Sequence, residues 1–343
     1  MNSLERFETA MNLEEPDRVP LGYLYLGAGR SVLNELGVTM RDVYYNAQGI
    51  VRTQLKAKEI FGHDNVMSPW GCMTVEAEAL GSKIEVKEMG YPKIVKYAVE
   101  EPGDADDLEV PDPLKDGRMP IILESLKILV DTVGKDTAVV GFLCSPFTIL
   151  DGIRGFDEVA KDMLMRPDIL KKMLEITTDT CIQYGKSMVD MGVNIILVKD
   201  GFAGADVMSR TQCLDFDIKY LKSVVKSLQN YGAKVIIANV SSKPYLDMQV
   251  ALNPNAICFA SGDIGEVKKK FGNKVCIMGN VDQTKMLFED AKDVEKEAKS
   301  CIEKAKEGGG YILSTGCEIP FKTPADNVKA LLTAVERYGV YRG

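Results

Sequence analysis

Short apolar runs alternate along this chain with longer segments in which apolar residues recur every three or four positions. The first pattern is typical of strands covered on both faces, and the second is typical of amphipathic helices. From the third run onward the apolar character is almost continuous, as in Ile195-Ile196-Leu197-Val198. The eight runs that we interpret as strands are 19–26, 65–68, 137–143, 194–199, 234–239, 256–260, 274–278 and 311–314.

Eight strands that alternate with helices predict a (β/α)8 TIM barrel. A short helix over 4–11 precedes the first strand as an N-terminal helical extension, and the segments 79–87 and 93–99 predict a small hairpin insertion. We find no linker or repeat, so we expect one domain over 1–343. The clearest helix carries an apolar stripe at Leu170, Met173, Leu174, Cys181, Met188 and Met191.

Composition narrows the class of protein. The chain has 343 residues, is 45% apolar and 27% charged, and carries a net charge of −8, which argues against a nucleic-acid partner. It begins without the apolar stretch of a signal peptide and has no run long enough to span a membrane. The eight cysteines are scattered, so we expect free thiols and a cytoplasmic protein.

Side chains at the carboxyl ends of barrel strands form the active site of this fold. Cys317 follows the last apolar strand, where a thiolate could bind a metal or act as a nucleophile, and a buried structural thiol is the alternative. Asp200 ends the fourth strand and could ligate a metal, act as a base or cap a turn. The other polar strand-end candidates are Tyr23, Tyr25, Arg30, Trp70, Cys72, Cys144, Ser145, Lys199, Asn239, Ser241, Ser261, Asp263, Asn280, Asp282 and Glu318.

Several kinds of chemistry are poorly supported. The only histidine, His63, lies just before a strand and should point away from the carboxyl ends, which disfavours Ser-His-Asp and Cys-His catalysis. No glycine-rich phosphate-binding motif follows a strand. Glu76 and Glu78 alternate in a segment that we interpret as an extended, solvated face.

Three stretches in this order resemble the uroporphyrinogen decarboxylase superfamily, and the similarity extends over essentially the whole chain. They are the opening from Arg6-Phe7 to Arg18-Val19-Pro20, the turn Gly279-Asn280-Val281-Asp282, and Gly316-Cys317-Glu318-Ile319-Pro320 with the following Thr323-Pro324. The superfamily fold is a (β/α)8 barrel, which agrees with the strand count.

The decarboxylases themselves fit poorly. Their Met-Arg-Gln-Ala-Gly-Arg pattern reads Leu26-Gly27-Ala28-Gly29-Arg30 here and keeps only the last arginine. Their aspartate after strand two is replaced around Pro69, and their Gly-His-Gly reads Gly316-Cys317-Glu318. The resemblance therefore disfavours decarboxylation.

The Gly-Cys form is similar to that of the corrinoid-dependent methyltransferase branch. There, zinc is held by His-x-Cys at the end of strand five and by the cysteine after strand eight. Cys317 matches the latter, but strand five offers Ile237 or Ala238 for the histidine and Asn239 for the cysteine. The resemblance implies zinc on Cys317, with Asp200 or Glu318 as possible further ligands.

This branch implies a methyl transfer between a small molecule and a corrinoid carried by a partner protein. Loss of His-x-Cys favours a methoxylated aromatic or another methyl ether as donor and Co(I) as acceptor, as in an anaerobic O-demethylase. Alternatives are a methylcobalamin:thiol methyltransferase and a non-catalytic or decarboxylase-like member. We assign catalytic roles to Asp200 and Glu318, and substrate contacts to Tyr23, Tyr25, Trp70, Asn239 and Asn280.

Overall fold

An all-parallel sheet forms the centre of the molecule. A computed structural model describes residues 1–68 and 74–341 and contains a seven-stranded sheet in the order β1-β4-β5-β6-β7-β8-β9. These strands coincide with the second to eighth predicted runs, and nearly all of their residues are buried because helices cover the sheet. The strands are β1 (Asn65–Ser68), β4 (Ala138–Cys144), β5 (Ile195–Asp200), β6 (Lys234–Asn239), β7 (Ala256–Phe259), β8 (Cys276–Met278) and β9 (Tyr311–Ile312).

The first predicted strand, 19–26, joins this sheet only in part. The Gly22 amide donates a hydrogen bond to the Leu313 carbonyl at 2.7 Å. On the other side, the side-chain amide of Asn65 exchanges two hydrogen bonds with the main chain of the segment, at 2.7 and 2.9 Å. The chain leaves the strand conformation at Tyr25, where φ is +60°. The segment therefore lies between β9 and β1, and regular eight-stranded closure stays a prediction.

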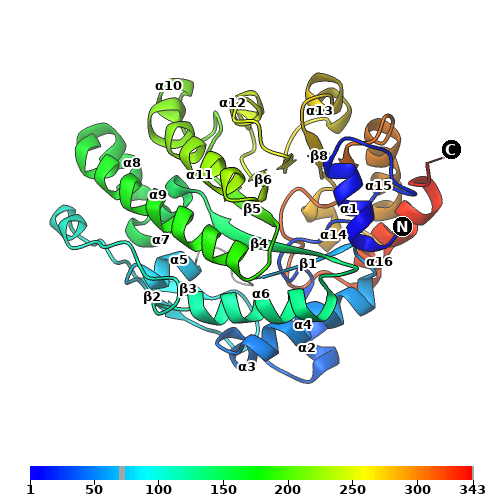
Figure 1. Cartoon of the computed structure of the whole chain (residues 1–343), viewed down its shortest axis with the longest axis horizontal. Helices are drawn as coiled ribbons and strands as arrows, with labels where there is room; N and C mark the ends of the chain where they lie inside the picture. The colour runs from blue at the N-terminus through cyan, green and yellow to red at the C-terminus, as the bar shows by residue number, and fades with distance from the viewer. Residues whose placement is uncertain (69–73, 342–343) are drawn as a thin grey trace.

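Helices follow the strands in turn along the chain (Figure 1), and the predicted Met-rich helix is α9, whose stripe is buried from Leu170 to Met188. None of the described helices is both long and apolar enough to cross a membrane. The α-helices are α1 (Ser3–Met11), α2 (Gly29–Leu36), α3 (Met40–Tyr44), α4 (Ala47–Phe61), α5 (Thr74–Ala79), α6 (Met119–Val133), α7 (Pro146–Arg154), α8 (Phe156–Met165), α9 (Pro167–Asp190), α10 (Arg210–Cys213), α11 (Lys219–Asn230), α12 (Leu246–Val250), α13 (Ile264–Phe271), α14 (Gln283–Phe288), α15 (Ala291–Ala305) and α16 (Ala325–Tyr338). A 3-10 helix, η1 (Pro102–Asp106), and a π-type turn, η2 (Leu214–Ile218), complete the set.

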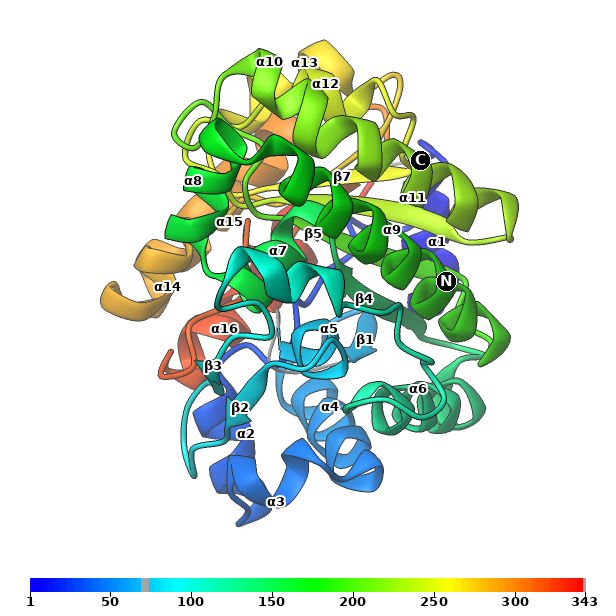
Figure 2. The same ribbon diagram turned by 90° about the vertical axis from the view of Figure 1, so that its left-hand side faces the viewer.

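The predicted hairpin insertion is present. Strands β2 (Lys83–Glu85) and β3 (Lys93–Lys96) pair in antiparallel fashion, separate from the main sheet. Figures 1 and 2 show this hairpin on the side of the molecule away from the two chain termini, and it packs against α5. The insertion is therefore peripheral and does not contribute a strand to the main sheet.

Asp64 joins the start of the chain to the sheet. Its side chain is 1% exposed and accepts hydrogen bonds from Arg6 Nη1 at 2.8 Å and from Arg18 Nη1 at 2.9 Å. The Ser3 hydroxyl (2.9 Å) and the Leu21 amide (2.8 Å) donate to the same carboxylate. Because Asp64 precedes β1, this cluster holds α1 and the segment 19–26 against the amino end of the sheet.

Candidate functional site

The direction of each strand-end side chain follows from the register of β4 and β5. A side chain at Gly141 of β4 would collide with Met188 of α9 (2.8 Å), so this position faces the helices. Cys144 lies three positions further along, and its register partner on β5 is Lys199. Neighbouring residues of a strand face opposite sides of the sheet. Lys199 therefore points to the interior of the curled sheet, whereas Asp200 points toward the helices.

Lys199, Cys317 and Glu318 are brought together at the carboxyl ends of the strands, and we call this site the mouth. Lys199 is 8% exposed, and Cys317 is half-buried. Burial raises the pKa of the Cys317 thiol, the positive charge of Lys199 opposes the rise, and the charge of Glu318 adds to it. Nearby charges exert such effects over short distances. The mouth therefore combines a thiol, an ammonium group and a carboxylate.

Asp200 belongs to a buried polar cluster on the helix side of the sheet. Its carboxylate accepts hydrogen bonds from the Gln249 amide (2.6 Å) and the Ser145 hydroxyl (3.4 Å), and it shares a hydrogen bond with Asp217 of η2. Burial raises the pKa of both aspartates, and the charge of Asp200 contributes to the rise at Asp217. Asn239 joins the cluster by donating to Gln249 Oε1 at 3.0 Å.

The structure therefore brings Asp200 and Asn239 to each other and not to Cys317. The two residues are register partners on β5 and β6, so they share the face opposite to Lys199. A metal site formed by Asp200 and Cys317 does not fit this geometry. The catalytic role predicted for Asp200 and the substrate contact predicted for Asn239 remain predictions, and both would have to act through other groups.

The aromatic residues proposed to bind the substrate differ in position. Tyr23 is buried with its ring stacked on His63 at 4.1 Å, and its hydroxyl donates to the Gly27 carbonyl at 2.5 Å. Tyr25 is also buried, but its ring meets Phe142 edge-on at 4.9 Å. Phe142 lies two positions before Cys144, the register partner of Lys199, and its side chain therefore also faces the interior of the curled sheet. Tyr25 therefore contacts an interior residue, whereas burial and the charge of Glu318, a residue of the mouth, raise the pKa of Tyr23. Trp70 lies outside the described residues.

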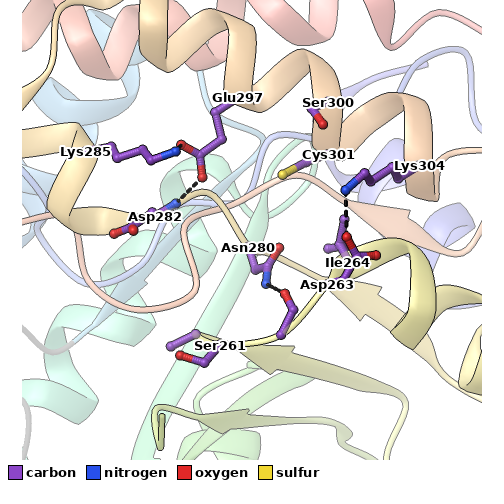
Figure 3. Close-up of a pocket in the computed structure, with 12 residues that line it drawn as sticks. Ser261, Asp263, Ile264, Asn280, Asp282, Lys285, Glu297, Ser300, Cys301 and Lys304 are labelled. Carbon is purple, nitrogen blue, oxygen red and sulfur yellow. Dashed lines mark hydrogen bonds and ion pairs between the residues drawn. The ribbon is translucent and has the colours of Figure 1, made fainter. Parts of the chain in front are cut away.

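Asn280 lines a separate polar cleft of about 380 Å³ between the loops after β7 and β8 and helix α15. Its side-chain amide donates to the Gly262 carbonyl at 2.9 Å. Figure 3 shows it among two paired groups, Lys304 with Asp263 at 2.6 Å and the Asp282 amide with Glu297 at 3.0 Å. Neither Cys317 nor the mouth lysine lines this cleft, so the predicted substrate contact of Asn280 remains a prediction.

The environment of Glu76 differs from the one that we predicted from the sequence. It lies in α5, a helix, and is 1% exposed, so the expected solvated strand face is wrong. Its Oε1 accepts the Cys144 amide at 2.8 Å, and burial raises the pKa of its carboxyl to about 7. The alternation of Glu with Ala around this position was a usable signal, because both residues favour helices over strands.

Among the residues that the structure describes, the donor set does not fit the implied zinc ion. Among residues 1–68 and 74–341, no group of three His, Cys, Asp or Glu side chains lies close enough together to hold a metal. Cys317 has the ammonium group of Lys199 nearby, and this charge would repel a divalent cation. The seven cysteines that the structure describes are all free thiols, as expected.

Related proteins cover this chain from end to end. It is 26% identical to the Methylcobamide:CoM methyltransferase MtaA of Methanosarcina barkeri, with 97% of each chain covered. It is 23% identical to the Methylcobamide:CoM methyltransferase MtbA of Methanosarcina mazei, also with 97% of each covered. A uroporphyrinogen decarboxylase of Actinobacillus succinogenes is 25% identical over 76% of this chain and 75% of its own.

Solved structures agree with this similarity. A methyltransferase from Methanosarcina mazei superposes with a TM-score of 0.88 at 25% identity, covering 98% of this chain and 99% of its own. A B12-independent methionine synthase from Shewanella sp. W3-18-1 shares the fold alone, with a TM-score of 0.56 and 13% identity over 84% and 86% of the two chains. The uroporphyrinogen decarboxylase (URO-D) model matches residues 2–338, and the chain therefore belongs to that family.

Proposed function

We propose that this protein is a cytoplasmic, corrinoid-dependent methyltransferase that moves a methyl group from a methyl ether to Co(I) of a separate corrinoid protein. Methoxylated aromatics are the favoured donors. The full-length similarity to two methylcobamide:CoM methyltransferases supports methyl transfer. The single observation that carries the choice of donor is the mouth itself, where Lys199 faces the interior beside Cys317 and a metal donor set does not form among the described residues.

The ammonium group of Lys199 suits an oxygen leaving group. Co(I) is a strong nucleophile, so the protein has to align the methyl carbon and stabilise the charge that develops on the departing oxygen. A fixed positive charge in a site with little water performs the second task. The ring of Tyr25 can pack against an aromatic donor on this side of the sheet, and Glu318 is the mouth carboxylate that remains from the predicted catalytic pair.

The reaction can be tested directly. With a Co(I) corrinoid protein, or free Co(I) cobalamin, and a methoxylated aromatic, the enzyme should form methyl-Co(III) and the free phenol, followed by the cobalt absorbance and by chromatography. Lys199→Met should slow transfer about 100-fold or more because a stabilising charge is lost, and Lys199→Arg should retain most of the rate. The control is Lys226→Met, which changes a lysine on α11 away from the mouth.

The runner-up is a methylcobalamin:thiol methyltransferase, which the names of the relatives favour. A thiol acceptor in this branch is activated by zinc, and the donor set described above does not fit that ion. No transfer from a panel of methyl ethers, together with methylation of a thiol by methylcobalamin, would move the assignment to the runner-up.

Metal removal gives a separate prediction. Because Cys317 lies beside an ammonium group, and because the described residues form no metal donor group around it, we expect extensive chelation to leave the rate of methyl transfer at its starting value. Elemental analysis before and after chelation and the transfer assay measure this. One zinc ion per chain, lost in Cys317→Ala together with activity, would contradict it.

A further inference from the structure

Glu76 lies at the carboxyl end of β4, where its side chain contacts the Cys144 amide. The Ser145 amide donates toward β5, to the Lys199 carbonyl at 2.7 Å. Successive amides of a strand point to opposite edges, so the Cys144 amide points toward β1. The last described register pair of β1 is Ser68 with Gly141, three residues before Cys144 on β4. Glu76 Oε1 accepts the hydrogen of the Cys144 amide at 2.8 Å, so the carboxyl group lies beside the carboxyl end of β4.

The second oxygen of this carboxyl group is buried and unused. Glu76 Oε2 has no hydrogen-bond partner among the described residues. An unsatisfied buried polar atom lowers stability, so native proteins retain few of them. Oε1 already accepts an amide hydrogen, and Oε2 is therefore the oxygen that can carry a proton and offer it to a ligand.

The groups that face Glu76 come from several elements. Arg118, at the start of α6, and Lys199 of β5 contribute positive charge, and both lower the pKa of Glu76. Tyr184 and Cys181 of α9 also interact with it electrostatically, and burial keeps the pKa of each well above its usual value. Burial of Glu76 outweighs the two cations and raises its pKa to about 7. A carboxyl group with this pKa exchanges its proton near neutral pH.

We propose that Glu76 is the general acid that protonates the departing oxygen of the methyl donor. This inference rests on the proposed function and assigns the proton that the reaction needs. The Co(I) electron pair forms the new bond to the methyl carbon, so cobalt becomes Co(III). The carbon–oxygen bond breaks with its electrons on oxygen, and that oxygen takes the proton from Glu76 Oε2. The products are methyl-Co(III), the free phenol or alcohol, and the Glu76 carboxylate, which water then reprotonates.

A series of methyl aryl ethers tests the assignment, because a weakly acidic phenol needs the proton more than an acidic one does. Glu76→Gln should slow transfer about 100-fold or more for the least acidic phenols and far less for nitrophenols. The wild-type rate should fall as pH rises through about 7, where the acid form of Glu76 is lost, and the variant should lack this fall. The control Glu78→Gln, on the same helix, should keep the wild-type dependence on both.

The results of this experiment distinguish a wrong role for Glu76 from a wrong function for the protein. If the wild type methylates Co(I) but Glu76→Gln slows all ethers equally, or slows none, Glu76 is not the acid while the function stands. If the wild type accepts no ether, both fail. Infrared spectroscopy provides a measurement without turnover. A protonated-carboxyl band present at pH 6 and lost by pH 8 should be absent from the folded Glu76→Gln variant.

Discussion

Replacing Asp64 with asparagine should lower the free energy of unfolding by about 3–5 kcal/mol, the range for breaking a buried ion pair from one side. The substitution keeps the shape of the side chain but removes the charge that faces Arg6 at 2.8 Å and Arg18 at 2.9 Å. The side chains of these arginines are only 11% and 16% exposed, so water cannot fully replace the carboxylate. The contacts that α1 and the segment 19–26 make with β1 should therefore weaken together.

Urea unfolding followed by circular dichroism measures this loss, and Asp17→Asn is the matched control. Asp17 also pairs with Arg6, at 2.6 Å, but its side chain is 42% exposed. Solvent screens such a pair, so the control should cost less than about 1 kcal/mol. Equal losses in the two variants would show that burial of Asp64 adds nothing to its ion pairs.

Replacing Glu76 with glutamine should stabilise the protein, and the gain should grow with pH. Burial raises the pKa of Glu76 from 4.5 to about 7. Below pH 4.5 the carboxyl is protonated in both states and contributes nothing. Between 4.5 and 7 the unfolded chain loses this proton first, so the unfolded state is increasingly favoured. Above 7 the penalty is constant at about 3 kcal/mol, and glutamine, which does not ionise, avoids it.

The measurement is the difference in unfolding free energy between Glu76→Gln and the wild type at pH 5 and at pH 8. The difference should be larger at pH 8 by roughly 2–3 kcal/mol. Glu124→Gln, at an exposed position on α6, should give the same small difference at both values. A pH-independent effect at position 76 would mean that the carboxyl ionises there as easily as in water.

The expected gain in stability and the expected loss of activity in Glu76→Gln have the same cause, the buried carboxyl group. A buried carboxyl that lowers stability at neutral pH is expected where the reaction needs a proton donor, because activity and stability then make opposite demands on one residue. A variant that is more stable and less active would fit the proposed acid. By contrast, Asp64 lies at the amino end of the sheet, and its substitution should affect stability without changing the leaving-group dependence of the reaction.

Several elements could be predicted from the sequence because their signals are local. A strand covered on both faces must be apolar throughout, and this requirement identified β1 and β4 to β9 to within two residues. The Met-rich stripe identified α9 in the same way. The family also follows from the chain alone, since its motifs are continuous stretches of sequence, and the match over residues 2–338 confirms it.

The face of the sheet on which a strand-end residue lies was not available from the sequence. Asp200 and Lys199 are adjacent, and both read as polar residues at the end of the same apolar run. Register against β4 and β6 turns Lys199 into the mouth and Asp200 into a helix-side cluster with Asn239. A shift of one residue reverses the face of every side chain in a strand, so pairing between distant segments has to be known.

Sequence patterns were sufficient to predict the order of strands and helices, the hairpin insertion, the family and the position of Cys317 after the last strand. Which polar groups meet at the strand ends depends on the tertiary structure. Burial of Glu76 depends on contacts with β4, far away in the chain, and the partial strand at 19–26 depends on the Asn65 side chain. Local patterns fix the elements because hydrophobic periodicity is local, whereas charge, burial and proton affinity arise only when distant segments pack together.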